Sequence, residues 1–218
     1  MLRFPCLVLD HDDTVVQSTP TINYPSFVES LRVLRPGVTV TLEQFLRWSY
    51  DPGFFPLCTD ILGMDEEELD LQVSHWRSYV RTHRPLPYPG FRALLHRQRA
   101  EGGLICVSSH SADENILRDY RESFSLEPDR IYSCDLPAEA RKPAPYALLD
   151  IMERYDLRPN QLLMADDMKP GCDMAKRCGV PFAAAGWSHQ LPEIAEDLRR
   201  QSDYYLETVE ELSHLLFD

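Results

Sequence analysis

The stretch CLVLDHDDT, residues 6–14, runs four apolar residues directly into three aspartates within four positions. A continuous apolar run of this length is typical of a strand that is buried on both faces of a parallel sheet. Asp10, Asp12 and Asp13 repel one another, and burying any of their charges is costly unless a positive group lies nearby. The stretch therefore predicts a buried strand whose C-terminal end faces a cation.

Further apolar runs with the same character follow along the chain. They are GLICVSS (103–109), QLLMADD (161–167) and the weaker PFAAAGW (181–187). Helix-like patterns alternate with these runs, at residues 91–103, 146–157 and 170–180. This alternation predicts an α/β fold with a Rossmann-like, doubly wound parallel sheet as its core.

Residues 17–87 interrupt the alternation of strands and helices. They contain helix-forming, aromatic-rich patches at 41–50 and 66–83 and no obvious buried strand. We therefore expect an α-helical domain over residues 17–87, inserted into and packed on a core domain formed by residues 1–16 and 88–218. Within the insertion, aromatic side chains such as Trp48, Tyr50, Phe54 and Phe55 are expected to be core residues more than pocket residues.

Composition limits the partners and the location. The 218 residues carry a formal net charge of −13, which disfavours nucleic acid and anionic membranes as partners. The six cysteines are scattered, without a C-x-x-C pair, so neither a zinc site nor a disulfide framework is expected. No signal peptide and no apolar window of membrane-spanning length is recognisable, so we expect a cytoplasmic protein. The oligomeric state cannot be read from the sequence.

Chemistry-bearing residues gather where the predicted strands end. In open α/β sheets, ligands bind outside the carboxyl ends of the strands. Magnesium takes oxygen ligands, commonly one or two carboxylates together with water and substrate phosphate. Asp10 and Asp166, from two different strands, are a natural pair of ligands, and a lysine and a serine hydroxyl could hold phosphoryl oxygens. The residues at or near these strand ends are Asp10, Asp12, Ser108, Ser109, Lys142, Asp166 and Asp167.

In this order, the motifs resemble the haloacid dehalogenase superfamily of aspartate-nucleophile phosphohydrolases, in its phosphoglycolate phosphatase-like and phosphoglucomutase-like branch with a helical cap. The first motif, D-x-D-x-T, is found at residues 10–14. The others are the serine in ICVSSHS (105–111), the lysine before proline in RKPAPYALL (141–149) and the acidic pair in LLMADDMKPGCDMAKRCGV (162–180).

The resemblance implies a role for each motif. Asp10 would be the nucleophile that forms an aspartyl-phosphate, and Asp12 the general acid and then the general base. Asp167 would lie behind the metal or share it. The substrate-binding residues would be Ser108, Ser109 and Lys142, and the Mg²⁺ ligands would be Asp10, Asp12 (through its backbone carbonyl) and Asp166.

The chain departs from the family pattern at a few positions. Ala165 replaces a glycine, Asp13 replaces another, and Pro170 and Gly171 stand where a further aspartate is expected. His11 is expected to pack away from the neighbouring aspartates, and His110 to flank the pocket, with substrate contact as the alternative.

The function expected is that of a magnesium-dependent phosphatase, a phosphoric monoester hydrolase acting on a small phosphorylated metabolite. A phosphosugar mutase of the same family and a catalytically silent phosphate-binding module remain as alternatives. A haloacid dehalogenase is disfavoured because that reaction needs neither Asp12 nor the acidic pair at Asp166 and Asp167. A response-regulator-like receiver is disfavoured by the order of the motifs.

Overall fold

The computed structural model describes residues 2–218, which divide into two compact units. Unit 1 comprises the residues up to Gln17 together with Pro87–Asp218, and unit 2 is Ser18–Leu86. The sequence placed these boundaries after residue 16 and before residue 88. Among residues 2–218, no helix combines the length and the apolar character needed to cross a bilayer.

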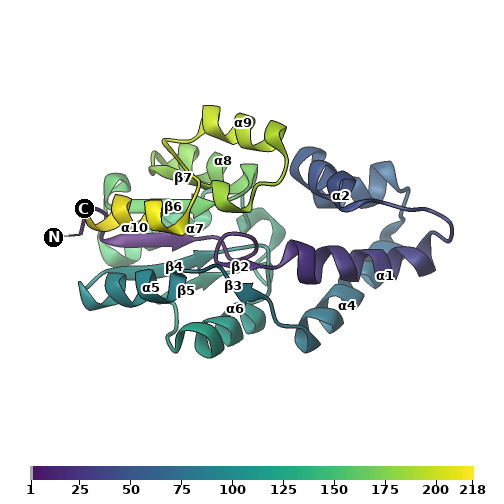
Figure 1. Ribbon diagram of the computed structural model, residues 1–218, viewed down its shortest axis with the longest axis horizontal. Helices are drawn as coiled ribbons and strands as arrows, with labels where there is room; N and C mark the ends of the chain where they lie inside the picture. Colours follow the sequence, from purple (N-terminus) through teal and green to yellow (C-terminus); the bar gives the residue numbers. More distant parts are fainter. Residues whose placement is uncertain (1) are drawn as a thin grey trace. The chain divides into compact units, whose positions relative to one another are not determined.

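Unit 1 is built on a six-stranded parallel sheet in the order β5-β4-β1-β6-β7-β8. Figure 1 shows helices on both sides of this sheet, with α8 and α9 on one side and α5 and α6 on the other. This is the doubly wound α/β architecture that the sequence predicts. The strands are β1 (Cys6–Leu9), β4 (Leu104–Ser108), β5 (Arg130–Tyr132), β6 (Leu162–Asp166), β7 (Phe182–Ala185) and β8 (Tyr204–Leu206).

The helices of unit 1 follow the strands in the expected alternation. They are α5 (Phe91–Ala100), α6 (Asp113–Asp119), α7 (Tyr146–Tyr155), α8 (Lys169–Cys178), α9 (Pro192–Gln201) and α10 (Val209–Phe217). Shorter helical turns lie at Tyr120–Phe124, Ala138–Ala140, Pro159–Gln161 and Gly186–Ser188. Two short strands, β2 (Val16–Gln17) and β3 (Leu86–Pro87), pair with each other outside the main sheet.

The central strands are buried on both faces, as their continuous apolar sequences predict. All residues of β1 and β7 are buried, and the same holds for β6. One face packs on α5, α6 and α10, where Leu7, Leu9, Ile105 and Val107 meet a cluster that includes Phe91. Burial of this kind contributes about 25 cal/mol for each Å² of apolar surface removed from water, which anchors the strand ends firmly.

Unit 2 is helical, as expected for residues 17–87. Phe27, Phe45 and Leu57 form its core with other apolar residues, and Trp48 and Phe54 pack against that core, whereas Phe55 is 53 % exposed. That this unit acts as a cap stays a prediction. Its helices are α1 (Tyr24–Leu34), α2 (Leu42–Trp48), α3 (Phe54–Pro56) and α4 (Glu66–Thr82), with short π-helical segments at Thr19–Asn23, Ser49–Gly53 and Leu57–Ile61.

Candidate active site

Three carboxylates meet where β1 and β6 end. The parallel register pairs Leu9 with Ala165, and the backbone N–H of Asp10 donates to the carbonyl of Ala165 at 2.8 Å. This pairing brings Asp10 level with Asp166, the last residue of β6. Carboxylate oxygens of Asp10, Asp166 and Asp167 lie within 4.8 Å of one another, and all three residues are buried. The predicted pair of acidic strand ends is therefore a cluster of three.

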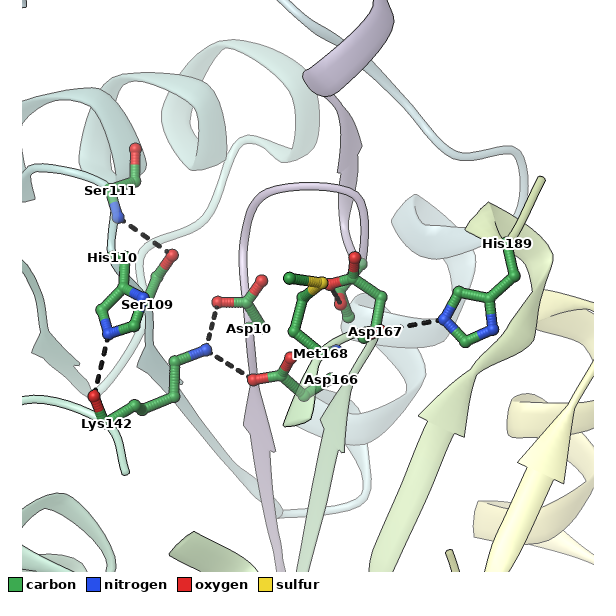
Figure 2. Close-up of polar contacts among 10 residues, drawn as sticks. Asp10, Ser109, His110, Ser111, Lys142, Asp166, Asp167, Met168 and His189 are labelled. Carbon is green, nitrogen blue, oxygen red and sulfur yellow. Dashed lines mark hydrogen bonds and ion pairs between the residues drawn. The ribbon is translucent and has the colours of Figure 1, made fainter. Parts of the chain in front are cut away.

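A single lysine ammonium binds two of these carboxylates. Nζ of Lys142 lies 2.7 Å from Oδ1 of Asp10 and 2.5 Å from Oδ2 of Asp166, as Figure 2 shows. The backbone of Lys142 is held in turn by His110, whose Nε2 donates to the Lys142 carbonyl at 3.0 Å. His110 thus contacts the lysine loop at the edge of the cluster. Lys142, which the sequence analysis singled out, is 132 residues away from Asp10 in the chain, yet its ammonium contacts the Asp10 carboxylate directly.

The cluster is electrostatically incomplete. Burial raises the pKa of Asp166 to about 7, although Lys142 opposes the rise. Burial, followed by the charges of Asp166 and Asp10, raises the pKa of Asp167 well above its usual range. Burial alone would lower the pKa of Lys142, but Asp10 and Asp166 raise it above its usual value. One ammonium does not balance three buried carboxylates, and these hard oxygen donors suit a divalent cation such as Mg²⁺.

Asp13 takes a left-handed backbone conformation in the loop after β1. Asp13 has a φ of 55°, in the left-handed region where aspartate is among the better tolerated residues after glycine. Its N–H donates to the carbonyl of Val16 at 2.7 Å, which closes the loop. Asp12 is half-buried in the same loop, two residues beyond Asp10, and is not one of the three clustered side chains. Its backbone carbonyl as a ligand and its acid–base role stay predictions.

The two predicted serines lie at the same edge of the sheet, at the end of β4. Leu9 pairs with Val107, so that Ser108 is level with Asp10 on the neighbouring strand. Ser109 follows directly, and its Oγ accepts a hydrogen bond from the N–H of Ser111 at 3.2 Å. Both serines are buried. Their part in phosphate binding stays a prediction.

Sequence reasoning missed several groups that hold the acidic residues. Thr14 Oγ1 donates to Oδ1 of Asp167 at 3.2 Å, and His189 Nε2 donates to the Asp167 carbonyl at 2.9 Å. The indole N–H of Trp187 donates to the Thr14 carbonyl at 3.0 Å. Thr14 was part of the first motif without a role of its own. His189, by contrast, lies in a short stretch without any pattern that points to the site.

His11 is buried, as its expected packing role requires, but its partner is polar. Its Nε2 lies 3.1 Å from Oδ2 of Asp119 at the end of α6, and Asp119 also accepts from Arg118. The side chain thus ties the loop between Asp10 and Asp12 to a neighbouring helix.

No protein-family model matches the sequence, and no curated protein matches it. Solved structures do match. A protein from Bacteroides fragilis described as a haloacid dehalogenase-like hydrolase is 19% identical, with a TM-score of 0.80, over 96% of this chain and 99% of that chain. CbbY from Rhodobacter sphaeroides, in complex with phosphate, is 18% identical, with a TM-score of 0.74, over 97% of this chain and 96% of that chain. A mutant of CbbY, in complex with xylulose-(1,5)bisphosphate, is 17% identical, with a TM-score of 0.75 and the same coverage.

These likenesses extend over nearly the whole chain, insertion included. At such low identities they show the fold, and the fold is that of the haloacid dehalogenase-like hydrolases. The resemblance that the four motifs indicate is therefore confirmed at the level of the fold.

Proposed function

We propose that this protein is a magnesium-dependent phosphatase that acts on a small phosphorylated metabolite through an aspartyl-phosphate. The observation that carries the proposal is the position of Lys142, which bridges Asp10 and Asp166 inside a buried carboxylate cluster at the carboxyl edge of the sheet. A nucleophilic carboxylate, a cation for phosphoryl oxygens and further metal ligands are the groups that this chemistry requires.

In the proposed reaction, a carboxylate oxygen of Asp10 forms a bond to phosphorus while the bond from phosphorus to the ester oxygen breaks. Asp12 gives its proton to the leaving oxygen. Asp12 then takes a proton from a water molecule, which attacks the phosphorus and releases phosphate from Asp10. Lys142 holds and neutralises phosphoryl oxygens during both steps. Bound Mg²⁺, held by Asp10, Asp166 and the backbone carbonyl of Asp12, with Asp167 behind the metal or sharing it, would supply further positive charge for those oxygens.

Phosphorylated sugars are the first substrates to consider. CbbY, which shares the fold, has been crystallised with phosphate and, as a mutant, with xylulose-(1,5)bisphosphate. We extend that class of ligand to this chain as part of the proposal. A divalent cation and Lys142 would neutralise the substrate locally, so that the net charge of −13 does not exclude an anionic ligand.

The test is phosphate release from p-nitrophenyl phosphate and from a panel of sugar and carboxylate phosphates, with Mg²⁺ and with EDTA. Asp10→Asn should lower turnover by at least about 10³-fold, because the amide is a poor nucleophile. Asp173→Asn, the same change in α8 outside the cluster, serves as the matched control and should retain turnover.

Three results would contradict the proposal. Turnover that persists in EDTA would exclude the metal dependence. A wild-type protein that releases no phosphate from any ester, yet interconverts sugar phosphates when a bisphosphate activator is added, would be a mutase instead. Silence in both assays would favour a phosphate-binding module without catalysis.

A further inference from the structure

A chain of hydrogen bonds leads from strand β8 into the carboxylate cluster. The hydroxyl of Tyr205 lies 3.0 Å from Nδ1 of His189, and Nε2 of His189 lies 2.9 Å from the carbonyl oxygen of Asp167. The next N–H along the backbone, that of Met168, donates to Oδ1 of Asp166 at 2.8 Å. Figure 2 shows His189 on the side of the cluster opposite to Lys142.

The directions of these hydrogen bonds follow from their partners. A carbonyl oxygen only accepts, so Nε2 of His189 carries the proton. In a neutral imidazole that carries its proton on Nε2, the other nitrogen is an acceptor, so Nδ1 accepts from the hydroxyl of Tyr205. Tyr205 therefore selects the tautomer of His189 that can donate to Asp167.

A single peptide unit connects His189 with Asp166. The carbonyl of Asp167 and the N–H of Met168 belong to the same planar group, which turns as one body. His189 holds the oxygen end of this group, and Oδ1 of Asp166 binds its hydrogen end. Any rotation that breaks the first hydrogen bond also misdirects the second. Donation to the carbonyl further polarises the peptide, which strengthens the N–H as a donor.

The environment of Tyr205 keeps the outer end of the chain in place. The guanidinium of Arg199 lies over the Tyr205 ring at 4.0 Å from its centroid. The backbone of Gly186 also lies close to the Tyr205 ring. A Cβ at residue 186 would lie 2.6 Å from both Cε1 and Cζ of that ring. The Tyr205 side chain thus contacts both Arg199 of α9 and the turn Gly186–Ser188 that leads to His189.

We propose that His189, oriented by Tyr205, is a positioning residue for the metal site: through the peptide between Asp167 and Met168 it fixes the orientation of both Asp166 and Asp167. The inference deepens the proposed function and rests on its metal site. Residues that hydrogen-bond to metal ligands fix the orientation of those ligands. Their removal typically weakens metal binding by about 10- to 100-fold. Asp167 is held twice, at its carbonyl by His189 and at its carboxylate by Thr14.

The test measures the dissociation constant of Mg²⁺ by isothermal titration calorimetry on the metal-stripped protein, without substrate. His189→Ala should weaken binding by about 10- to 100-fold, and Tyr205→Phe by a smaller factor, because the ring then loses its selected tautomer. His189→Gln places an amide N–H near the position of Nε2 and should restore most of the affinity. The thermal unfolding of each metal-free variant is recorded alongside.

The chain offers matched controls for both changes. His96 also donates from Nε2 to a backbone carbonyl, that of Phe124 at 2.8 Å, outside the cluster. Tyr204 precedes Tyr205 on β8, and its hydroxyl accepts from Arg3 instead. His96→Ala and Tyr204→Phe should leave Mg²⁺ affinity unchanged, whatever they do to stability.

Equal Mg²⁺ affinity in wild type, His189→Ala and Tyr205→Phe would overturn the inference, even if both variants unfold at lower temperature. Should His189→Ala fail to fold, Tyr205→Phe decides the question alone. A wild-type protein that binds no Mg²⁺ would overturn the metal site itself and with it this inference. A protein that binds Mg²⁺ in the predicted order of affinities but hydrolyses no ester would refute the proposed function and support the inference.

Discussion

The packing of Gly171 against Asp166 gives a sharp test of how the cluster is positioned. A Cβ at residue 171 would lie 2.1 Å from Oδ2 of Asp166, whereas ordinary contact begins at 3.4 Å. In Gly171→Ala the two groups must therefore separate by about 1.3 Å, the difference of those two distances. Oδ2 is the oxygen that Lys142 binds at 2.5 Å, and Asp166 is fully buried, so the displacement falls on the lysine contact and on the metal site.

Stability and activity should respond differently to this change. Overpacking typically costs about 1–3 kcal/mol. Alanine in a helix gains about 1 kcal/mol over glycine, so the net loss of stability should be roughly 0–2 kcal/mol and the protein should fold. A misplacement of about 1 Å at a catalytic group can cost about 10²-fold in rate. We therefore expect kcat/KM for p-nitrophenyl phosphate to fall by about 10²-fold, and Mg²⁺ affinity by about 10-fold or more.

Gly103→Ala is the matched control, because a Cβ there would lie 2.3 Å from Nε2 of Gln98, away from the cluster. Gly103 lies outside the helices, so this variant gains nothing in helix propensity and should lose about 1–3 kcal/mol of stability, without a change in Mg²⁺ affinity. Steady-state kinetics, calorimetric Mg²⁺ titration and urea unfolding are measured on both variants. If Gly171→Ala folds and binds Mg²⁺ with wild-type affinity and rate, then close packing does not position Asp166, and the reasoning is refuted.

Three further predictions concern the charges of the cluster. Lys142→Met leaves Asp10 and Asp166 without their buried cation and should destabilise the metal-free protein by about 3–5 kcal/mol in urea unfolding. Saturating Mg²⁺ should recover part of this loss. An unchanged urea midpoint would contradict the assignment of Lys142 as the cation that stabilises the cluster. Because the pKa of Asp166 is raised to about 7, the folded metal-free protein takes up a proton that the unfolded chain does not. Its stability should therefore increase as the pH falls from 8 to 7, by at most about 1.4 kcal/mol per pH unit for each proton bound, and thermal unfolding with and without Mg²⁺ should show a smaller slope in the metal-bound form. Thr14→Val removes the hydroxyl that binds Asp167 and should weaken Mg²⁺ binding by about 10-fold in calorimetry, with little loss of stability; equal affinity would show that this hydrogen bond does not orient Asp167.

The parts of the fold that the sequence predicted are those buried on both faces. β1, β4, β6 and β7 lie within the four apolar runs, because a central parallel strand needs apolar residues at every position. The two strands of the six-stranded sheet that were missed, β5 (Arg130–Tyr132) and β8 (Tyr204–Leu206), are the edges of that sheet. They have three residues each and are only partly buried, so their sequences lack that signature.

Site residues at the ends of the buried strands could be predicted from the sequence, whereas those in loops were harder to find. Asp10 and Asp166 follow from the rule that parallel strands end at one edge of the sheet. Lys142 reaches them from a loop, and only the order of the four motifs singled it out. His189 acts on a backbone carbonyl, 22 residues away in sequence. A bond of that kind requires no particular partner residue and therefore leaves no pattern in the sequence.

The charges of the cluster also bear on the order of binding in the proposed reaction. Three carboxylates against one ammonium leave a formal charge of −2, which one divalent cation cancels. Without that cation, the site opposes a phosphate anion. Burial first, and then the like charges of the neighbouring aspartates, raise the pKa values of Asp166 and Asp167, so the metal-free site favours proton uptake. Protons and Mg²⁺ therefore compete for one set of oxygens. Phosphate should bind the metal-free protein only weakly, and the cation should have to enter before the substrate.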